Sequence, residues 1–234
     1  MSIYETIDHP LELFETLRSI KSNADRITHT SLQLADIAMR FSGVDRVPRY
    51  ASGERESDVE HSYMLALVAP EIADMLKLPF DLGLISQYAI VHDLIELKTN
   101  DIATFIISDA DLAAKHMNEQ VEIHNLAAEL PFHTASMLLA YESQVDPESR
   151  FVKMIDKLLP VIVDIIGQGD RVMYEDYDVY TSDDLATAHE TLRIRMAIRF
   201  GEEFPAAVLA HEILTKMYED VFTPHSENGG KEDE

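Results

Sequence analysis

The sequence contains no cysteine, and only 8 glycines and 9 prolines among its 234 residues. The absence of cysteine excludes a disulfide framework, thiolate zinc sites, iron–sulfur clusters and a thiol nucleophile. The small number of glycines and prolines argues against collagen-like or linker-rich chains and favours long regular elements. Apolar residues make up 46% of the chain and charged residues 26%, so we expect a globular protein rather than a disordered one.

Positive charge is also scarce, because 19 Lys and Arg residues stand against 43 Asp and Glu residues, a net charge of −24. Such a surface repels phosphate backbones, so we expect no nucleic-acid polymer as a partner, although a small anionic ligand held by a metal and local cations is compatible with it. No apolar run reaches the 18 or so residues that cross a bilayer. The start of the chain also lacks the basic and apolar regions of a secretory signal. We therefore expect a cytoplasmic protein with no membrane partner.

The apolar residues recur mainly at helical spacing, as in the series that includes Leu17, Ile20 and Ile27. Ser57 followed by Glu60 has the form of a capping box, and Asp146 before Pro147 combines a helix cap with proline at the first helical position. Further helices are expected over residues 82–97, 108–130 and 134–143, and from residues 182 and 205 onward. No alternation of apolar and polar residues is long enough to indicate a strand. The pattern predicts an all-α fold.

Two segments interrupt this helical pattern. Residues 42–56, with Gly43, Pro48 and Gly53, are expected to form a loop, and the Tyr- and Asp-rich residues 168–181 are expected to form a long loop or a lid. We predict one compact domain over residues 1–221, with a core at about 30–165, a C-terminal helical extension over 182–221, and a disordered acidic tail over 222–234.

Ionisable residues interrupt two of the most apolar expected helices. His61 lies one turn into the first, and His92, Asp93 and Glu96 follow an apolar run in the second. Burying such groups without partners costs several kcal/mol, and a divalent cation would satisfy imidazole and carboxylate together. On one helix, residues 92, 93 and 96 would project from one side. Histidines that stand singly are expected to be satisfied core residues instead, namely His116, His124, His133, His189 and His211.

The order His61, then His92-Asp93, then Asp156 resembles the H…HD…D pattern of the HD-domain phosphohydrolases. The resemblance covers about residues 30–160 and includes the neighbourhoods of the first histidine and the last aspartate. It implies an all-α, metal-dependent enzyme in which His61, His92, Asp93 and Asp156 hold one divalent transition metal. Two imidazoles and two carboxylates leave room on a six-coordinate ion for water and a phosphate oxygen, and they suit Mn, Fe, Co, Ni or Zn.

Residues 92–101 are similar to the HDxxExxxxD segment of bacterial 5′-deoxynucleotidases. This similarity implies hydrolysis of the 5′-phosphate of a (deoxy)nucleoside monophosphate, with Glu96 and Asp101 positioning and deprotonating the attacking water. Asp101 would alternatively cap a helix that starts at Ile102. Related enzymes with the same core cleave deoxynucleoside triphosphates, which gives a second enzymatic reading. A nucleotide-sensing protein without turnover is a third, although the presence of both Glu96 and Asp101 speaks against it.

A phosphate substrate needs cations in a chain this acidic. The resemblance places a phosphate-binding arginine before the first ligand helix, where Arg49 lies, and Arg55 is a rival because the spacing of Arg49 to His61 departs from the family pattern. Lys153 and Lys157 flank Asp156 and fit either substrate binding or a solvated helix face. The resemblance also implies pairing of two chains, with the helices of residues 183–221 as the dimer face.

Overall fold

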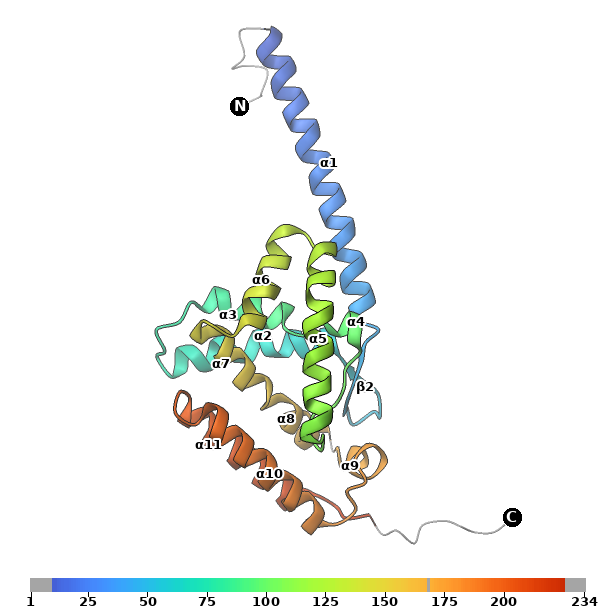
Figure 1. The fold of residues 1–234 in the computed structure, drawn as a ribbon, viewed down its shortest axis with the longest axis vertical. Helices are drawn as coiled ribbons and strands as arrows, with labels where there is room; N and C mark the ends of the chain where they lie inside the picture. Colours follow the sequence, from blue (N-terminus) through green and yellow to red (C-terminus); the bar gives the residue numbers. More distant parts are fainter. Residues whose placement is uncertain (1–9, 168, 226–234) are drawn as a thin grey trace, which may run out of the picture. The chain divides into compact units, whose positions relative to one another are not determined.

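The computed structural model describes residues 10–167 and 169–225. Within them, helices dominate and only one two-stranded sheet occurs, so the predicted all-α class is confirmed (Figure 1). The elements in chain order are α1 (Pro10–Phe41), β1 (Asp45–Arg49), β2 (Arg55–Ser57), α2 (Asp58–Met75), α3 (Leu82–Val91), α4 (Glu96–Thr99), α5 (Asp109–Glu129), α6 (Phe132–Ser143), α7 (Pro147–Asp156), α8 (Leu159–Gly167), α9 (Asp170–Asp176), α10 (Ser182–Phe200) and α11 (Pro205–Val221). None of the helices in this described part has both the length and the apolar character needed to span a bilayer.

The chain divides into two units, Met1–Met39 and Arg40–Glu234. Most of the first unit is α1, one continuous helix that contains the apolar series of Leu17, Ile20 and Ile27 and ends at Phe41, just inside the second unit. All the site residues discussed below belong to the second unit. The predicted domain limits stay a prediction, and most of the expected tail lies outside the described residues.

Local capping sets several helix starts as the sequence predicts. The Ser57 hydroxyl accepts a hydrogen bond from the Glu60 amide at 3.3 Å, while the Glu60 carboxylate accepts one from the Ser57 amide at 2.9 Å. Asp146 accepts a hydrogen bond from the Ser149 amide at 2.8 Å, with Pro147 at the first position of α7. Each such cap contributes about 1 kcal/mol to stability. Because α2 and α7 carry His61 and Asp156, these caps also fix the start of two site-bearing helices.

The expected loop over residues 42–56 is instead a β-hairpin, which the sequence reading missed. Strands β1 and β2 pair antiparallel, with Asp45 opposite Ser57 and Arg49 opposite Arg55. The strands are too short for a visible alternation of apolar and polar residues, and Pro48 also obscures the pattern. The hairpin matters for the site because its strand geometry determines whether Arg46, Arg49 or Arg55 faces the interior.

Two further expectations differ from the structure. The segment expected to be a long loop contains the short helix α9, which begins directly after Gly169. The helix expected over residues 82–97 ends at Val91, and α4 resumes at Glu96. The amides of Leu94 and Glu96 bond the carbonyls three residues earlier, at 3.1 and 2.9 Å, so a tight turn replaces the regular α-helical ladder. His92 and Asp93 therefore lie at a break in the helix rather than on one of its faces.

Two apolar clusters hold the second unit together. The larger one joins α2, α3 and α7 through fully buried side chains such as Leu65, Ile85 and Phe151. The smaller one joins the later helices through residues that include Val161 and Leu185. Complete burial of a large apolar side chain stabilises a fold by about 1.5–3 kcal/mol. Because α8 contributes to both clusters, it is packed against each of them directly after Asp156, the last residue of α7.

Candidate metal centre

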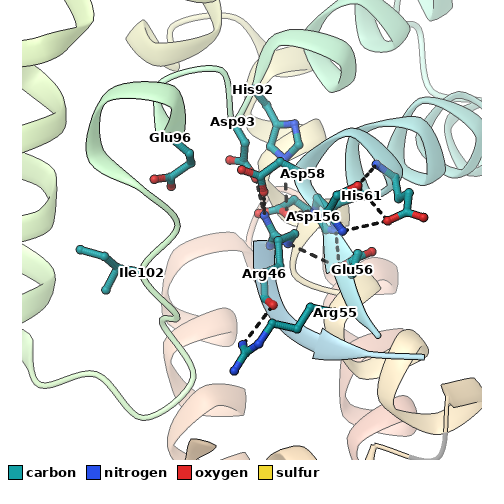
Figure 2. Close-up of polar contacts among 12 residues, drawn as sticks. Arg46, Arg55, Glu56, Asp58, His61, His92, Asp93, Glu96, Ile102 and Asp156 are labelled. Atoms are coloured by element: carbon teal, nitrogen blue, oxygen red, sulfur yellow. Dashed lines mark hydrogen bonds and ion pairs between the residues drawn. The ribbon is translucent and has the colours of Figure 1, made fainter. Parts of the chain in front are cut away.

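Four side chains that are far apart in the sequence meet between α2, the end of α3 and the end of α7. His61, His92, Asp93 and Asp156 each offer one ligand atom, and these atoms all lie within 4.8 Å of one another. The Nε2 atom of His61 is 2.8 Å from Oδ1 of Asp156, and Nε2 of His92 is 3.0 Å from Oδ2 of Asp93. Figure 2 shows the four side chains pointing toward one another. The structure thus brings together all four residues predicted as metal ligands.

The hydrogen bonding of His92 leaves its second ring nitrogen facing the carboxylates of the cluster. Nδ1 of His92 lies 2.9 Å from the carbonyl oxygen of Ala89, so this nitrogen carries a proton and donates it. The lone pair of Nε2 then faces only the carboxylates of Asp93 and Asp156, at 3.0 and 3.7 Å. Burial opposes a charged imidazole, but these two carboxylates outweigh it and raise the pKa of His92 to about 10. Nitrogen and oxygen donors of this kind suit a divalent transition metal, which would take the place of that proton. The residues therefore fit the metal that their pattern implies.

Glu56 adds a carboxylate behind His61. The Glu56 side chain is fully buried, and its Oε2 atom lies 3.4 Å from Nδ1 of His61, on the side of the ring away from Asp156. A carboxylate on the second nitrogen of a ligating histidine orients the ring and increases its basicity. This contact supports Nε2 as the atom of His61 that would hold a metal.

Arg46 lies beside the cluster, and the sequence reading missed it. This strand β1 residue is buried, and its Nη1 atom is 2.6 Å from Oδ2 of Asp93 and 3.0 Å from Oδ1 of Asp58. Burial opposes the charge of the guanidinium, but the neighbouring carboxylates, Asp93 foremost, raise the pKa of Arg46 well above its ordinary value. Although the pairing of β1 is irregular between Asp45 and Arg49, burial alternates along the strand and leaves Arg46 buried and Arg49 only partly buried. Recognising the hairpin would have been needed to choose between them.

Arg49 and Arg55, the arginines predicted to bind substrate, contact α9 instead of the metal cluster. Their Nη2 atoms lie 3.1 and 2.6 Å from the two carboxylate oxygens of Asp176. Neither arginine lines the cavities described below. Their roles in substrate binding stay predictions, and within the described residues Arg46 is the hairpin arginine closest to the ligands.

Glu96 and Asp101, the two predicted catalytic residues, both line a cavity next to Asp93. Glu96 is buried, and its carboxylate oxygens lie 2.9 Å from Nζ of Lys115 and 2.9 Å from the hydroxyl of Thr99. Burial raises the pKa of Glu96 to about 8, although Lys115 opposes the shift. The alternative for Asp101 is wrong, because residues 101–107 form no helix and α5 starts at Asp109 behind the cap Ser108. Lys115 was not foreseen from the sequence.

Comparison with known proteins places this site in a family. A model of the HD domain matches residues 43–194, which is more than half of the chain. The chain belongs to the HD-domain family. No curated protein matches it.

Solved HD-type structures share the fold. A protein from Magnetospirillum magnetotacticum MS-1, described as a predicted metal-dependent phosphohydrolase, superposes with a TM-score of 0.62 at 19% identity and covers 85% of this chain and 96% of its own. An HD-domain phosphohydrolase from Listeria innocua superposes with a TM-score of 0.51 at 20% identity and covers 80% of this chain and 97% of its own. At these identities, the likeness supports the same fold.

The first of two cavities at the metal centre of this HD domain is largely apolar. Its volume is about 120 Å³, and it reaches Arg46, Asp93, Glu96 and Asp156 at the metal centre. The rest of its wall is dominated by apolar side chains, among them Val47, Phe105, Val161, Val172, Met173 and Leu192. Polar groups also line this cavity, namely Asp101, Lys115, Lys157, Asp164 and His189. We call this space the apolar cavity.

The second cavity shares Asp93, Glu96, Lys115, Asp156 and Lys157 with the first. It has further cations on the rest of its wall, together with the carboxylates of Glu119 and Glu142. Its volume is about 160 Å³, and we call it the basic cavity. Its basic lining residues are Lys115, His116, Lys153, Lys157, Arg195 and Arg199. Partial desolvation lowers the pKa of His116. The charges of Lys153, Arg199 and Lys115 act in the same direction, whereas Glu119 opposes the shift. Lys153 and Lys157 were considered from the sequence, whereas Lys115, Arg195 and Arg199 were not, because they lie on helices outside the recognised motif. His116, expected to be a core residue, is exposed.

Proposed function

We propose that this HD-domain protein is a metal-dependent phosphohydrolase that removes the 5′-phosphate of a (deoxy)nucleoside monophosphate. The observation that carries the proposal is the meeting of four ligand atoms within 4.8 Å, at the junction of an apolar cavity and a basic one. The apolar cavity suits an organic group and the basic cavity suits anionic oxygens. The structural neighbours described as phosphohydrolases support the reaction class.

The side chains around the centre divide the work of hydrolysis. His61, His92, Asp93 and Asp156 would hold the metal, which when bound polarises a phosphoryl group and lowers the pKa of water. Glu96 has a pKa near neutral because it is buried, as a general base requires, and its contact with Lys115 fixes its position. Asp101 lines the same cavity and would orient the water with Glu96. Arg46 presents a guanidinium beside Asp93, where a phosphate oxygen would approach.

Two substitutions separate metal binding from proton transfer. Glu96→Gln keeps the size of the side chain and removes the base, so we expect bound metal to be retained and turnover to fall by roughly 10²–10⁴-fold. Asp93→Asn removes a ligand charge, so we expect loss of bound metal. The measurements are metal content by elemental analysis and phosphate release from nucleoside monophosphates with Mn, Co, Ni, Zn or Mg. Metal loss in the Glu96 variant with retention in the Asp93 variant would show that the roles are reversed.

The basic cavity favours a second candidate, hydrolysis of a deoxynucleoside triphosphate. Nζ of Lys153 lies 5.9 Å from the ring centre of Tyr141, and Arg199 lies over the ring of Phe200 at 5.1 Å. Among the described residues, neither cation has a carboxylate within ion-pairing distance. Both are therefore available to the additional phosphates of such a substrate. A higher kcat/KM for triphosphates than for monophosphates would favour this candidate.

The third hypothesis, a nucleotide sensor, predicts that the protein binds nucleotide without hydrolysing it. If the purified protein binds metal and nucleotide but releases no phosphate with any of the five metals, that hypothesis replaces the hydrolase. The cytoplasmic location and the pairing of chains through residues 183–221 stay predictions. The molar mass in solution, measured for the wild type and for a variant with exposed apolar residues of that segment replaced by polar ones, would test the pairing.

A further inference from the structure

A buried carboxyl group in the apolar cavity has no role in the site described so far. Asp164 lies on α8, is 7% exposed and lines the apolar cavity. Its Oδ1 atom is buried and has no hydrogen-bond partner among the described residues. The charged groups that act on it, Glu56 and Asp170, are both acidic and therefore give it no compensation.

The backbone around Asp164 is shaped to hold this carboxyl group. The Asp164 carbonyl accepts a hydrogen bond from the Gly169 amide at 2.8 Å, which folds the chain back over the side chain. A Cβ atom at Gly169 would lie 2.5 Å from Oδ1 of Asp164, so only glycine leaves room for the carboxyl group there. Burial raises the pKa of Asp164 well above its ordinary value. Burial thus favours the protonated form of the carboxyl group, which can donate one hydrogen bond.

The position of Asp164 relative to the metal centre suits contact with the organic part of a substrate. Asp164 and Val161 line the cavity from α8, which begins just after Asp156 and Lys157. From Leu159 to Asp164 the helix rises about 7.5 Å, so the carboxyl group lies farther along the cavity wall than the metal ligands. An apolar pocket with a few placed polar groups gains its specificity from those groups. An unpartnered carboxyl among apolar side chains is destabilising, and a ligand would remove that cost.

We propose that Asp164 is a specificity-determining residue that forms a hydrogen bond with the nucleobase of the phosphorylated substrate. This inference rests on the proposed function, since it assigns the apolar cavity to the base and the metal centre to the phosphate. Phe105 forms part of the same wall and offers an aromatic surface to a flat ring. Asp164 selects among substrates and takes no part in the bond cleavage.

Substrates with and without a base provide the test. Asp164→Leu removes the polar group and suits the apolar wall, whereas Asp164→Asn keeps a hydrogen-bond donor. We expect Asp164→Leu to lower kcat/KM for the preferred nucleotide by roughly 10- to 100-fold, as expected for a lost buried hydrogen bond. Activity on 2-deoxyribose 5-phosphate, which has no base, should stay unchanged. Asp164→Asn should alter the order of preference among the four bases by a smaller factor. Asp220→Asn, at an exposed position of α11, is the control.

Binding of unphosphorylated nucleosides to the full chain, measured by calorimetry, gives a readout that does not depend on turnover. We expect the Leu variant to bind the preferred nucleoside at least about 10-fold more weakly than the wild type. Equal loss on the nucleotide and the abasic sugar phosphate, or no loss on either, would overturn the proposal, as would a large drop in melting temperature in both variants. If the wild type hydrolyses neither compound but binds nucleosides through Asp164, the proposed hydrolysis fails while this inference stands.

Discussion

The apolar cavity and the basic cavity share one wall, which includes Lys115 and Lys157, and differ in the side chains that line them away from it. Both reach Asp93, Glu96 and Asp156, so each opens on the same ligand cluster. Away from that cluster, one is walled by residues such as Phe105 and Val172, whereas the other is walled by residues such as Arg199. A substrate that fills both must carry an apolar ring on one side of its phosphorus and negative charge on the other.

The difference also shows how an acidic chain accommodates an anion. The net charge of −24 repels phosphates at long range, but salt screens exposed charges beyond about 10 Å at 0.1 M ionic strength. Near the metal centre, the cations of the basic cavity and Arg46 offset the carboxylates that line the same space. The absence of a nucleic-acid polymer as a partner stays a prediction, and these local cations are compatible with a nucleotide.

The largest expected loss of activity follows from substitution of a metal ligand in the wall that both cavities share. Asp156→Ala removes a ligand that lies 2.8 Å from His61, so we expect loss of bound metal and at least a roughly 10³-fold loss of activity on every phosphorylated substrate. Removal of metal by a chelator should have the same effect and should be reversible. Metal content and phosphate release measure both. If Asp156→Ala affected only one class of substrate, the cavities would not share one centre.

A smaller and selective effect is expected in the basic cavity. Replacing Lys153 and Arg199 together by glutamine removes two cations that have no carboxylate within ion-pairing distance among the described residues. At such partly exposed positions each contact with phosphate is worth about 0.5–1.5 kcal/mol. We expect KM for a deoxynucleoside triphosphate to rise by roughly 10- to 100-fold, with little change for the monophosphate. Steady-state kinetics on both substrates checks this.

Lys216→Gln is the matched control for these substitutions, because Lys216 is an exposed cation on α11, outside both cavities. An equal rise of KM for monophosphate and triphosphate in the double variant would contradict the division of labour between the cavities. It would mean that the basic wall holds the phosphate being cleaved.

A still smaller effect is expected in the apolar cavity. Phe105→Leu keeps the position apolar but removes an aromatic face, which is worth about 1 kcal/mol in ring contacts. We expect a roughly five-fold weaker binding of nucleosides and no change in the inhibition by inorganic tripolyphosphate. Calorimetry and inhibition kinetics distinguish the two. Because Phe105 also contacts Tyr177 and His189, the melting temperature must be compared first.

The sequence predicted the metal centre better than it predicted the residues that line the two cavities. His92 and Asp93 stood out because ionisable residues interrupted an apolar run, and the caps at Ser57 and Asp146 followed from local chemistry. The same signal was present at Asp164, a single acid within the apolar segment of α8, but it was not recognised. Arg199 could not be placed, because it lies on a helix whose packing depends on contacts distant in sequence.

The hairpin shows a second limit. Arg46, Arg49 and Arg55 are residues of the same type, and only the folding of the hairpin decides that Arg46 faces Asp93 while the other two reach Asp176. A one-residue shift of register would exchange inward and outward side chains, so no count of residues from His61 identifies the inward arginine.

Ionic strength gives the smallest and most direct contrast between the cavities. Arg199 is exposed and Lys153 half-buried, so their attraction for phosphates is screened by salt, whereas burial of a ring is not. Between about 0.05 M and about 0.5 M salt, we expect KM for the triphosphate to rise several-fold while nucleoside binding changes by less than about two-fold. The Lys153 and Arg199 double variant should lose most of this salt dependence. If nucleoside binding were as sensitive to salt as the triphosphate, charge rather than apolar contact would govern both cavities.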